Sequence, residues 1–340
     1  MMEMLNNAKI LITGGTGSFG KKFIEAIFNK YNPDKVVILS RDEYKQFMVR
    51  QMFEKKLTKK QFSKLRFFIG NVRDRERLYR AFKGIDYVIH AAAMKQVPAC
   101  EYNPKEAIKT NINGAMNIID AALDCGVKKV IALSTDKAVN PINLYGGTKL
   151  VSDKLFIAAN SYKGEKGTVF SVVRYGNVAG SRGSVIPFFQ KLIDNGATEL
   201  PVTDIRMTRF WMTLEKASEL VFKALDESKG GETFVFKNES FKITELVKAM
   251  LPSGKIKEVG IRTGEKLHER MITSDDSRMT YEYGDYYIIY PDFEWWNFEE
   301  YFLPGGKLIE QGWEYNSGDN SEWLDAKDLK KALDEIEIGY

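Results

Sequence analysis

The sequence contains few of the residues that usually bind transition metals. Its 340 residues include two cysteines, Cys100 and Cys125, and two histidines. The cysteines do not have the spacing of zinc ligands, and with only two histidines beside them a zinc site is not expected. We therefore predict no metal site.

Long apolar runs and a large excess of either charge are also missing. Nowhere do about eighteen apolar residues follow one another, so we predict no membrane-spanning helix. The first residues, Met1–Ala8, lack the apolar stretch and the cleavage site of a signal peptide, and we expect a cytosolic protein. Lys and Arg total 50 and Asp and Glu total 46, a balance that argues against a nucleic-acid partner.

Short apolar segments alternate with longer helical patterns in the first half of the chain. Continuous apolar strands separated by helices are typical of a parallel sheet that is covered on both faces. We therefore predict an α/β fold, a Rossmann-type doubly wound parallel sheet. The predicted strands are Lys9–Thr13, Lys35–Ser40, Leu65–Ile69, Asp86–His90, Lys129–Leu133 and Val169–Arg174, with a further one at Thr233–Phe236.

The chain is long enough for a nucleotide-binding domain and a smaller C-terminal substrate-binding lobe. We assign residues 1–178 to the dinucleotide-binding domain, with 206–236 returning to it. Residues 179–205 and 237–340 are assigned to the substrate-binding lobe. We also predict a helix over about Asn111–Cys125 that ends at Gly126. A last helix should place Leu329, Leu333 and Ile336 on one face.

A glycine-rich turn follows the first predicted strand. Its residues are Gly14, Gly15, Thr16, Gly17, Ser18, Phe19 and Gly20. Glycines at this spacing tighten the turn and let backbone amides approach a pyrophosphate, and the following helix adds its N-terminal dipole. A turn that binds nothing is the alternative, but its place after the first strand of a βαβ array favours a dinucleotide.

The end of the second strand indicates which dinucleotide is bound. NAD enzymes usually have a carboxylate there, which binds the ribose hydroxyls. This chain has Ser40, Arg41 and Asp42, with Lys45 nearby. The guanidinium of Arg41 suits a 2′-phosphate, and we expect Asp42 to point elsewhere. We predict NADP, although Arg41 could also be a solvated loop charge.

A tyrosine four residues before a lysine places both side chains on one helix face. The ammonium can then lower the pKa of the phenol and bind the cofactor ribose. This spacing occurs at Tyr31–Lys35, Tyr79–Lys83, Tyr145–Lys149 and Tyr162–Lys166. Only Tyr145–Lys149 opens a helix shortly after the fifth strand, beside Ser134 and Thr135. We predict catalytic roles for Thr135, Tyr145 and Lys149 and expect the other pairs to be exposed.

These motifs resemble the extended short-chain dehydrogenases/reductases. More narrowly, the chain resembles the inverting UDP-N-acetylglucosamine 4,6-dehydratases that begin pseudaminic acid biosynthesis. The similar stretches span most of the chain: 90–98, 101–104, 134–149 (STDKAVNPINLYGGTK), 174–185 (RYGNVAGSRGSV), 203–211 and 261–269 (IRTGEKLHE). Related capsule-pathway dehydratases have Met where this chain has Tyr145. Two positions depart from the pattern, Gln96 in place of His and Asn71 in place of an Asp beside the adenine.

The resemblance implies a three-step reaction on a nucleotide sugar. The sugar is oxidised at C4, water is removed across C5 and C6, and the hydride returns to C6. The second step needs a base at C5 and an acid at the C6 hydroxyl. The resemblance implies that Asp136 is the acid and Lys137 the base, whereas the alternative for this pair is a surface salt bridge.

Further binding residues complete the predicted site. Cationic and amide donors suit the diphosphate of a nucleotide sugar, although each arginine alone could be a plain surface charge. The predicted substrate-binding residues are Met94, Lys95, Asn177, Arg206, Arg209, Arg262 and Glu265. The predicted cofactor contacts beyond the glycine turn and Arg41 are Asn71, Val72, Ala91 and Ala92.

Two other functions fit the same fold. A nucleotide-sugar 4-epimerase shares the Tyr–Lys redox step but never eliminates water, so it has no use for Asp136 and Lys137. A non-catalytic NADP-sensing protein tends to lose the Tyr or the Lys, and this chain keeps both. We predict UDP-N-acetylglucosamine as the substrate and a homo-oligomer between a dimer and a hexamer.

Overall fold

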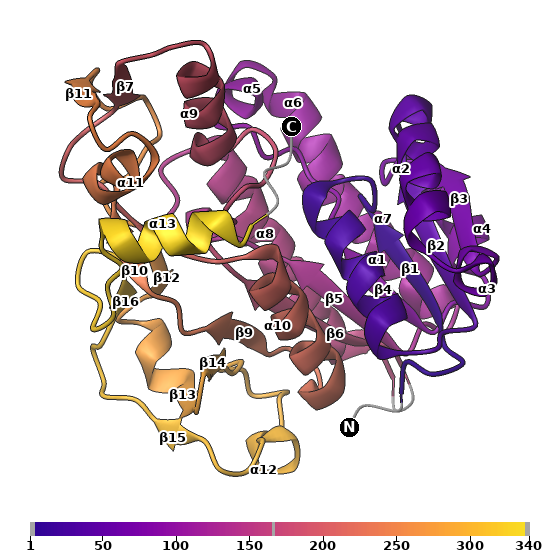
Figure 1. The fold of residues 1–340 in the computed structure, drawn as a ribbon. Coiled ribbons are helices and arrows are strands. Elements are labelled where there is room, and N and C mark those ends of the chain that lie inside the picture. Colours follow the sequence, from indigo (N-terminus) through magenta and orange to yellow (C-terminus); the bar gives the residue numbers. More distant parts are fainter. Residues whose placement is uncertain (1–3, 165–166, 337–340) are drawn as a thin grey trace.

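A computed structural model describes residues 4–164 and 167–336, so Lys166 of one predicted Tyr–Lys pair and the first three residues of Met1–Ala8 lie outside the described residues. Its centre is a ten-stranded sheet with the order β15-β13-β14-β9-β6-β5-β4-β1-β2-β3 (Figure 1). Seven of these strands are parallel: β1 (Lys9–Thr13), β2 (Lys35–Ser40), β3 (Leu65–Ile69), β4 (Tyr87–His90), β5 (Lys129–Leu133), β6 (Val169–Arg174) and β9 (Thr233–Phe236). All the predicted strands are confirmed, with β4 one residue shorter than expected.

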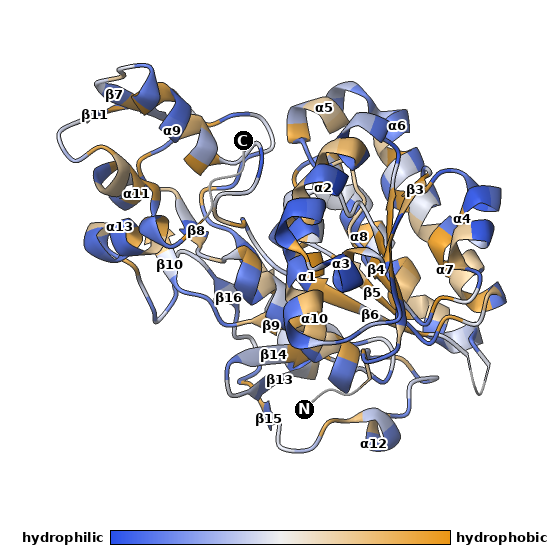
Figure 2. Cartoon of the chain, turned by 45° about the vertical axis from the view of Figure 1, so that its right-hand side comes forward, coloured by the Kyte–Doolittle hydropathy of each residue, from blue (hydrophilic) through white to orange (hydrophobic). Residues whose placement is uncertain are grey.

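The strand order is that of a Rossmann fold. The order reverses between β1 and β4, and open α/β sheets bind ligands at the carboxyl ends of the strands beside such a switch point. Residues of β1 alternate between two cores, with Ile10 and Ile12 on one face of the sheet and Leu11 on the other. Figure 2 shows hydrophobic strands between helices whose outer faces are hydrophilic.

Helices cover both faces of the sheet, as predicted for a doubly wound fold. One layer is made of α1 (Ser18–Lys30), α2 (Glu43–Lys56) and α10 (Leu214–Glu227). The other layer is made of α4 (Arg75–Phe82), α7 (Gly114–Asp124) and α8 (Leu144–Ala158). The predicted helix over Asn111–Cys125 begins as a π-helix, Lys109–Asn113, and continues as α7. Gly126 follows it with a φ of 70°, as expected of a glycine after a helix.

An antiparallel extension of the sheet was not expected from the sequence. It consists of β14 (Tyr286–Ile289), β13 (Thr280–Tyr283) and β15 (Lys307–Leu308), and β14 pairs with β9. The assignment of all of 237–340 to a second lobe is therefore wrong for this stretch. The aromatic side chains of the hairpin join the core of the main sheet, and the open edge of β9 supplies hydrogen-bond partners.

The remaining elements form a smaller region beside the main sheet (Figure 1). Its strands pair as β10–β8, β11–β7 and β12–β16, and Phe189, Leu246 and Leu329 lie in its core. The predicted last helix is confirmed as α13. The elements of this region are β7 (Glu199–Val202), β8 (Thr208–Phe210), β10 (Ser240–Lys242), β11 (Lys255–Glu258), β12 (Arg270–Ile272), β16 (Tyr315–Asn316), α9 (Val185–Asp194), α11 (Ile243–Met250) and α13 (Ala326–Asp334).

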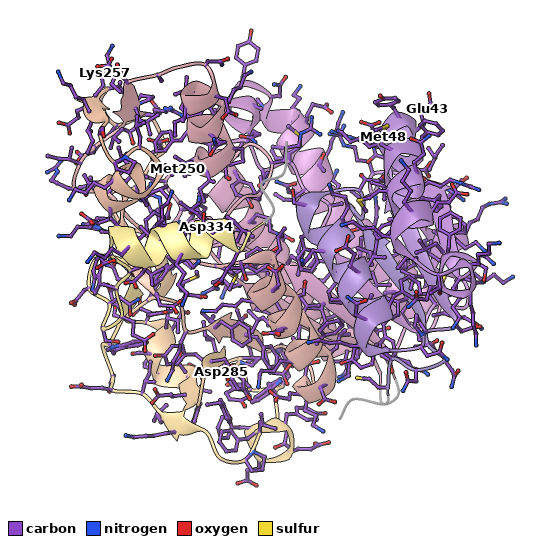
Figure 3. The ribbon with its side chains drawn as sticks, viewed as in Figure 1. Glu43, Met48, Met250, Lys257, Asp285 and Asp334 are labelled. Carbon is purple, nitrogen blue, oxygen red and sulfur yellow. The ribbon has the colours of Figure 1, made fainter. Side chains whose placement is uncertain are left out.

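Short helices complete the chain. They are α3 (Lys59–Phe62), α5 (Val97–Tyr102), α6 (Pro104–Ile108), α12 (Phe298–Tyr301) and the 3-10 turns Asp136–Ala138, Ala159–Tyr162 and Asp276–Met279. Figure 3 shows polar side chains pointing outward around the protein, among them Glu43 on α2 and Lys257 on β11. Within the described ranges, no helix is long and apolar enough to cross a membrane.

Candidate active site

The glycine-rich turn lies where the ends of β1 and β4 meet. Gly14 has a φ of 68°, which glycine adopts without strain. A Cβ at Gly14 would lie 2.9 Å from the amide nitrogen of Ala92, so the turn is in contact with the segment after β4. A Cβ at Gly20 would lie 2.5 Å from Cα of Gly15. Only glycine therefore permits this turn and this close packing of α1.

The start of α1 is suited to an anion. Its N-cap residue, Gly17, supplies no side-chain cap, so the first amides of the helix remain available to a ligand at the positive end of the dipole. Ser18 accepts a hydrogen bond from the Arg182 amide at 3.2 Å, which holds that loop beside the turn. Phe19 packs on Phe23 in the core, so only its backbone is left to face a cofactor.

The side chains after β2 differ in whether they have a partner. Asp42 caps α2 by accepting a hydrogen bond from the Lys45 amide at 2.9 Å, and its carboxylate also pairs with the Lys45 ammonium at 3.0 Å. The charges of Asp42 and Lys45 are thus paired with each other. Arg41 is exposed, and among the described residues its guanidinium has no partner. Of the two cations after β2, Arg41 rather than Lys45 is therefore without a partner among the described residues.

The segments after β3 and β4 lie at the same edge of the sheet as the glycine-rich turn. Val72 is buried against Gly114 of α7, where a Cβ would lie 2.8 Å from it, and Asn71 accepts a hydrogen bond from the amide of Arg73 at 3.1 Å. The amide of Ala91 donates to the carbonyl of Thr13 at 3.2 Å. The predicted contacts at Asn71, Val72, Ala91 and Ala92 thus follow the carboxyl ends of β3 and β4, between which β1 and β2 lie in the sheet.

Tyr145 and Lys149 lie one turn apart in the first half of α8, and both are buried. Asn143 caps this helix by accepting a hydrogen bond from the Gly146 amide at 2.8 Å. A Cβ at Gly146 would lie 2.0 Å from the carbonyl oxygen of Lys137. The glycine after Tyr145 thus allows α8 to pack closely against the Asp136–Lys137 turn.

The protonation of Tyr145 differs from the expectation. Burial raises the pKa of Tyr145 to about 12, and the positive charge that opposes this is that of Lys137. The sequence predicted that Lys149 would lower this pKa. Burial instead lowers the pKa of the Lys149 ammonium itself, with the charge of Asp153, one turn farther along α8, acting against it. Asp153 is a buried group that the sequence reading missed.

Asp136 and Lys137 form an ion pair after β5 in which Asp136 is buried and Lys137 is half-buried, with 23% of its side chain exposed. The Lys137 ammonium lies 3.0 Å from Oδ1 of Asp136, whose side chain is 1% exposed. Thr135 donates a hydrogen bond to the same oxygen at 2.8 Å, whereas Oδ2 of Asp136 is buried without a partner among the described residues. The Lys137 ammonium also lies 3.4 Å from Oδ1 of Asn177. The pair therefore lies beside Tyr145 and next to the predicted substrate amide.

A second carboxylate, Glu269, completes this cluster. Its side chain is 3% exposed, and Oε1 lies 3.3 Å from the Lys137 ammonium. Glu269 precedes β12, far from Lys137 in sequence, and the sequence reading did not single it out. Its only signal was its place at the end of the similar stretch 261–269.

The charges in this cluster overturn one expectation and agree with another. The base role that the resemblance implies for Lys137 needs a neutral amine. Burial does act to lower the pKa of Lys137, but Asp136 and Glu269 outweigh burial and raise it, so the side chain is an ammonium. Burial, together with the charge of Glu269, raises the pKa of Asp136, which suits a group that must carry a proton. Burial acts to raise the pKa of Glu269, but Lys137 and Arg209 outweigh it and lower that pKa.

The predicted substrate cations lie in different environments. Arg209 donates to the carbonyl oxygens of Thr208, Leu267 and Lys266 at 2.7, 3.0 and 3.1 Å. This corrects its predicted role, because the guanidinium holds the loop before Glu269 in place and is not free for a diphosphate. Arg206, on the surface, pairs with Asp204 at 2.6 Å.

The loop before β12 carries the other predicted cation. Arg262 is exposed and lies 3.9 Å from Glu265, a separation that leaves its guanidinium accessible to an anion. Asn143 donates to the Gly264 carbonyl at 2.8 Å, so the loop is attached to the start of α8. Arg262 and Glu265 thus lie on a loop anchored at the catalytic helix.

The segment after β4 is anchored to α8 through a buried asparagine. Asn111 accepts a hydrogen bond from the Met94 amide at 2.8 Å and donates to the Met94 carbonyl and to the Thr148 hydroxyl, each at 2.9 Å. Lys95 follows Met94, and although much of the residue is exposed, its ammonium is partly shielded from water by the surrounding protein. Its pKa is lowered by burial of the ammonium and by the nearby charge of Lys137, which places Lys95 at the same cluster.

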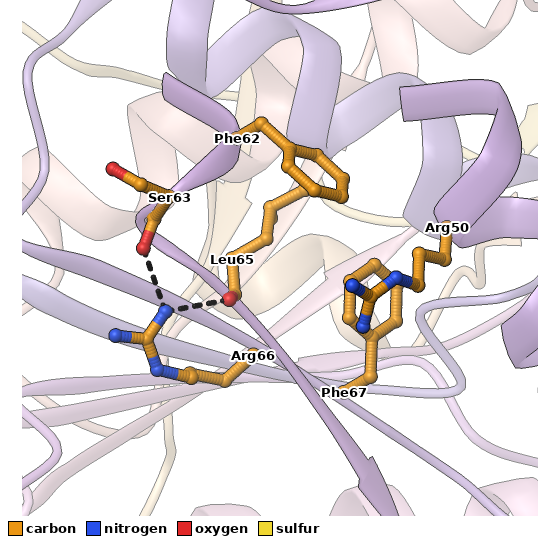
Figure 4. Close-up of a pocket in the computed structure, with 6 residues that line it drawn as sticks. All are labelled: Arg50, Phe62, Ser63, Leu65, Arg66 and Phe67. Atoms are coloured by element: carbon orange, nitrogen blue, oxygen red, sulfur yellow. Dashed lines mark hydrogen bonds between the residues drawn. The ribbon is translucent and has the colours of Figure 1, made fainter. Parts of the chain in front are cut away.

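A shallow hollow elsewhere has no part in this site. Figure 4 shows that Arg50, Phe62, Ser63, Leu65, Arg66 and Phe67 line it. It lies beside β3, at the opposite edge of the parallel strands from β6 and β9, and Arg66 donates within it to the carbonyl oxygens of Ser63 and Leu65. The titratable side chains of the candidate site lie instead near the carboxyl ends of β4 and β5.

The fold, the glycine turn and the Tyr145–Lys149 helix are those of an extended short-chain dehydrogenase/reductase. The chain belongs to the polysaccharide biosynthesis protein family, which matches residues 10–291. It is 52% identical over 339 residues to a UDP-N-acetylglucosamine 4,6-dehydratase (inverting) from Campylobacter jejuni subsp. jejuni serotype O:23/36, covering 98% of this chain and 99% of the relative.

Two other similar proteins extend this comparison. A UDP-glucose 4-epimerase from Rickettsia canadensis is 41% identical over 339 residues, covering 97% of this chain and 96% of the relative. The X-ray structure of Pen from Bacillus thuringiensis superposes with a TM-score of 0.87 at 37% identity and covers 97% of this chain and 98% of that one. Both a dehydratase and an epimerase thus occur among the similar proteins.

Proposed function

We propose that this protein is a UDP-N-acetylglucosamine 4,6-dehydratase that inverts C5. The product would be UDP-2-acetamido-2,6-dideoxy-β-L-arabino-hex-4-ulose, an intermediate of pseudaminic acid-type sugar synthesis. The observation that carries the proposal is the ion pair between buried Asp136 and half-buried Lys137, beside Tyr145. An epimerase has no elimination step that would need an acid and a base. The 52% identity to the Campylobacter jejuni dehydratase, against 41% to the Rickettsia epimerase, supports the same choice.

We propose NADP as the cofactor. The residues around the glycine-rich turn fit this cofactor. Gly14 allows a close backbone approach, and α1 begins without a side-chain cap. Arg41 is a cation without a partner among the described residues, where the 2′-phosphate would lie. The buried ammonium of Lys149 would hold the ribose hydroxyls. When bound, the nicotinamide supplies a place for the C4 hydride and returns it to C6.

The side chains divide the proton transfers among themselves. Tyr145, as the phenolate, accepts the proton of the C4 hydroxyl. Lys137, as the neutral amine, takes the proton from C5, which the C4 ketone has made acidic. Asp136 gives its proton to the C6 oxygen, which leaves as water. The unsaturated intermediate then turns in the site, so that Lys137 returns a proton to the opposite face of C5, and this inverts the centre.

The remaining residues would bind the substrate. We propose that Asn177, Arg206 and Arg262 bind the diphosphate, and that Met94, Lys95 and Glu265 line the rest of the substrate site. Guanidinium groups match phosphate oxygens with two parallel hydrogen bonds. We also propose a homo-oligomer, because Met116 on α7 and Val151 on α8 expose 41% and 42% of their apolar side chains.

Product analysis tests the proposed function. The purified protein would be incubated with UDP-N-acetylglucosamine and NADP, and NMR spectra of the product recorded. We expect the C6 protons to appear as a methyl doublet beside a C4 ketone. A product that keeps its C6 hydroxyl and differs only in configuration at C4 would establish an epimerase, and unchanged substrate would contradict catalysis.

Arg41→Asp tests the choice of cofactor. The variant should bind NADP at least tenfold more weakly, a loss of about 1.4 kcal/mol for each tenfold step, because a carboxylate repels the 2′-phosphate. NAD affinity should change little. Calorimetric titration of both dinucleotides gives the two constants, and Lys60→Asp, the same charge reversal at an exposed position of α3, is the control. Equal affinity of the unmodified protein for NAD and NADP would contradict the prediction.

A further inference from the structure

Glu269 is held rigidly at the edge of the catalytic cluster. Its amide donates to the Ser317 hydroxyl at 2.9 Å, and its carbonyl accepts from the Ser317 amide at 2.8 Å. Of its carboxylate oxygens, Oε1 lies 3.3 Å from the Lys137 ammonium and 3.6 Å from Nε of Arg209. The other oxygen, Oε2, is buried and has no hydrogen-bond partner among the described residues. This carboxylate therefore has a free acceptor in a dry position beside Lys137.

The groups around Lys137 come from five parts of the fold. They are Asp136 in its own turn, Tyr145 on α8, Lys95 after β4, Arg209 on β8, and Lys266 and Glu269 before β12. Three of these are cations, two are carboxyls and one is a phenol. Of these six groups, only the two carboxyls contact the Lys137 ammonium directly, at 3.0 and 3.3 Å. The ammonium also lies 3.4 Å from the uncharged Oδ1 of Asn177.

This arrangement creates a difficulty for the C5 step. The two carboxyls raise the pKa of Lys137, and an ammonium cannot accept a proton. Asp136 cannot relieve it, because its own proton is required at the C6 oxygen. Glu269 is the other carboxyl in contact with Lys137, and it is ionised because its cationic neighbours lower its pKa.

We propose that Glu269 is the proton partner of Lys137, accepting one proton from its ammonium before the C5 step and returning it afterwards. This inference rests on the proposed function. An N–H bond of Lys137 breaks as an O–H bond forms on Glu269, which leaves a neutral amine and a neutral carboxyl. The amine takes the C5 proton, gives a proton back to C5 after hydride return, and is protonated again by Glu269. Lys137 and Glu269 thus end the cycle as they began, whereas Asp136 regains its proton and Tyr145 loses its proton by exchange with solvent.

Substrate binding would favour this transfer. A sugar that covers the cluster excludes water, and exclusion of water disfavours a separated pair of charges relative to a neutral pair. The contact at 3.3 Å is short enough for transfer after a small adjustment. Glu269 acts on the sugar only through Lys137 and is therefore a positioning residue.

The test measures the C5 step by itself. The keto sugar made by the unmodified protein is incubated in heavy water with each NADP-loaded variant, and the rate of deuterium entry at C5 is followed by NMR. An enzyme-free sample corrects for spontaneous exchange. Glu269→Gln should slow this exchange on the order of 100-fold near neutral pH. The control is Glu314→Gln, which removes the carboxylate that pairs at 2.9 Å with Arg270, the residue after Glu269. This variant should leave the rate unchanged.

The pH dependence separates a proton partner from a structural support. In Glu269→Gln the Lys137 proton must leave to solvent, so the C5 exchange rate should rise about tenfold per pH unit. In the unmodified protein the pair keeps its one shared proton, and the rate should be flat between about pH 6 and about pH 9. Glu269→Asp keeps a carboxylate and should retain the flat profile at a reduced rate.

Several outcomes would overturn this role. They are a near-normal rate in Glu269→Gln, a loss in that variant that is equal at every pH, or a rate in the unmodified protein that climbs tenfold per pH unit. The last measurement needs no folded variant, so it decides the matter even if Glu269→Gln fails to fold. Absence of a keto sugar product from the unmodified protein would instead contradict the proposed function.

Discussion

Lys137→Ala is expected to stop the reaction after the sugar has been oxidised at C4. The variant lacks the base for C5, whereas Tyr145 and Lys149 are unchanged, so the absorbance of reduced nicotinamide should appear and persist. Release of water should fall by about 100-fold to 10,000-fold, the range that a positioned general base contributes. Stopped-flow absorbance and NMR of the product separate the two steps.

The control for this variant lies just before the same strand. Lys128 precedes β5 and pairs with Asp86 at 2.9 Å, away from the carboxyl ends of the strands. Lys128→Ala removes the same side chain and should dehydrate the sugar at the normal rate. Near-normal dehydration by Lys137→Ala would remove Lys137 from the base role, and loss of C4 oxidation in that variant would assign it an earlier function.

Tyr145→Phe should abolish the first step. Without the phenol no group accepts the C4 hydroxyl proton, so turnover should fall by about 1,000-fold while substrate affinity is kept, as for an interaction made in the transition state. Because burial holds the pKa of Tyr145 near 12, turnover of the unmodified protein should rise with pH through the neutral range when oxidation is rate-limiting. Steady-state kinetics and substrate titration provide both quantities.

Another tyrosine with the same spacing is the control. The Tyr79 hydroxyl donates to Asp124 at 2.5 Å near the outer surface of α4 and α7. Tyr79→Phe should turn over normally. If Tyr145→Phe bound substrate poorly and turned over normally at saturation, Tyr145 would be a binding residue only.

The parallel half of the fold could be predicted because its signals are local. Continuous apolar strands, a glycine turn after the first of them and a glycine after α7 are readable from short windows of sequence. The antiparallel extension was missed for the opposite reason. The hairpin of β13 and β14 pairs with β9 across about fifty intervening residues, and nothing local marks which edge an aromatic hairpin will join.

The catalytic cluster was predicted only in part for a similar reason. Tyr145 and Lys149 lie four residues apart, and Asp136 and Lys137 are adjacent, so each pair is visible in the sequence. Glu269 reaches Lys137 only because the loop before β12 folds back onto the end of β5. The charge of Lys137 depends on that contact, so adjacency to Asp136 alone could not predict it.

Gly146 is a single residue whose role could not be predicted from the sequence, because it depends on a tertiary contact. The sequence contains a glycine after Tyr145 but gives no reason for it. In the structure, the site for a Cβ at Gly146 lies 2.0 Å from the Lys137 carbonyl oxygen. The requirement comes from the approach of α8 to the turn after β5, which is a tertiary contact.

The most direct test of the proposed dehydration with inversion at C5 is the reaction of UDP-N-acetylglucosamine in heavy water with the unmodified protein. Removal of the C5 proton and its replacement from solvent are what distinguish an inverting dehydratase from an epimerase. We expect a 6-deoxy-4-keto product with deuterium at C5 and none at C6, whose added hydrogen comes from C4 of the same molecule. A product without deuterium at C5, or one that keeps its C6 hydroxyl, would contradict it.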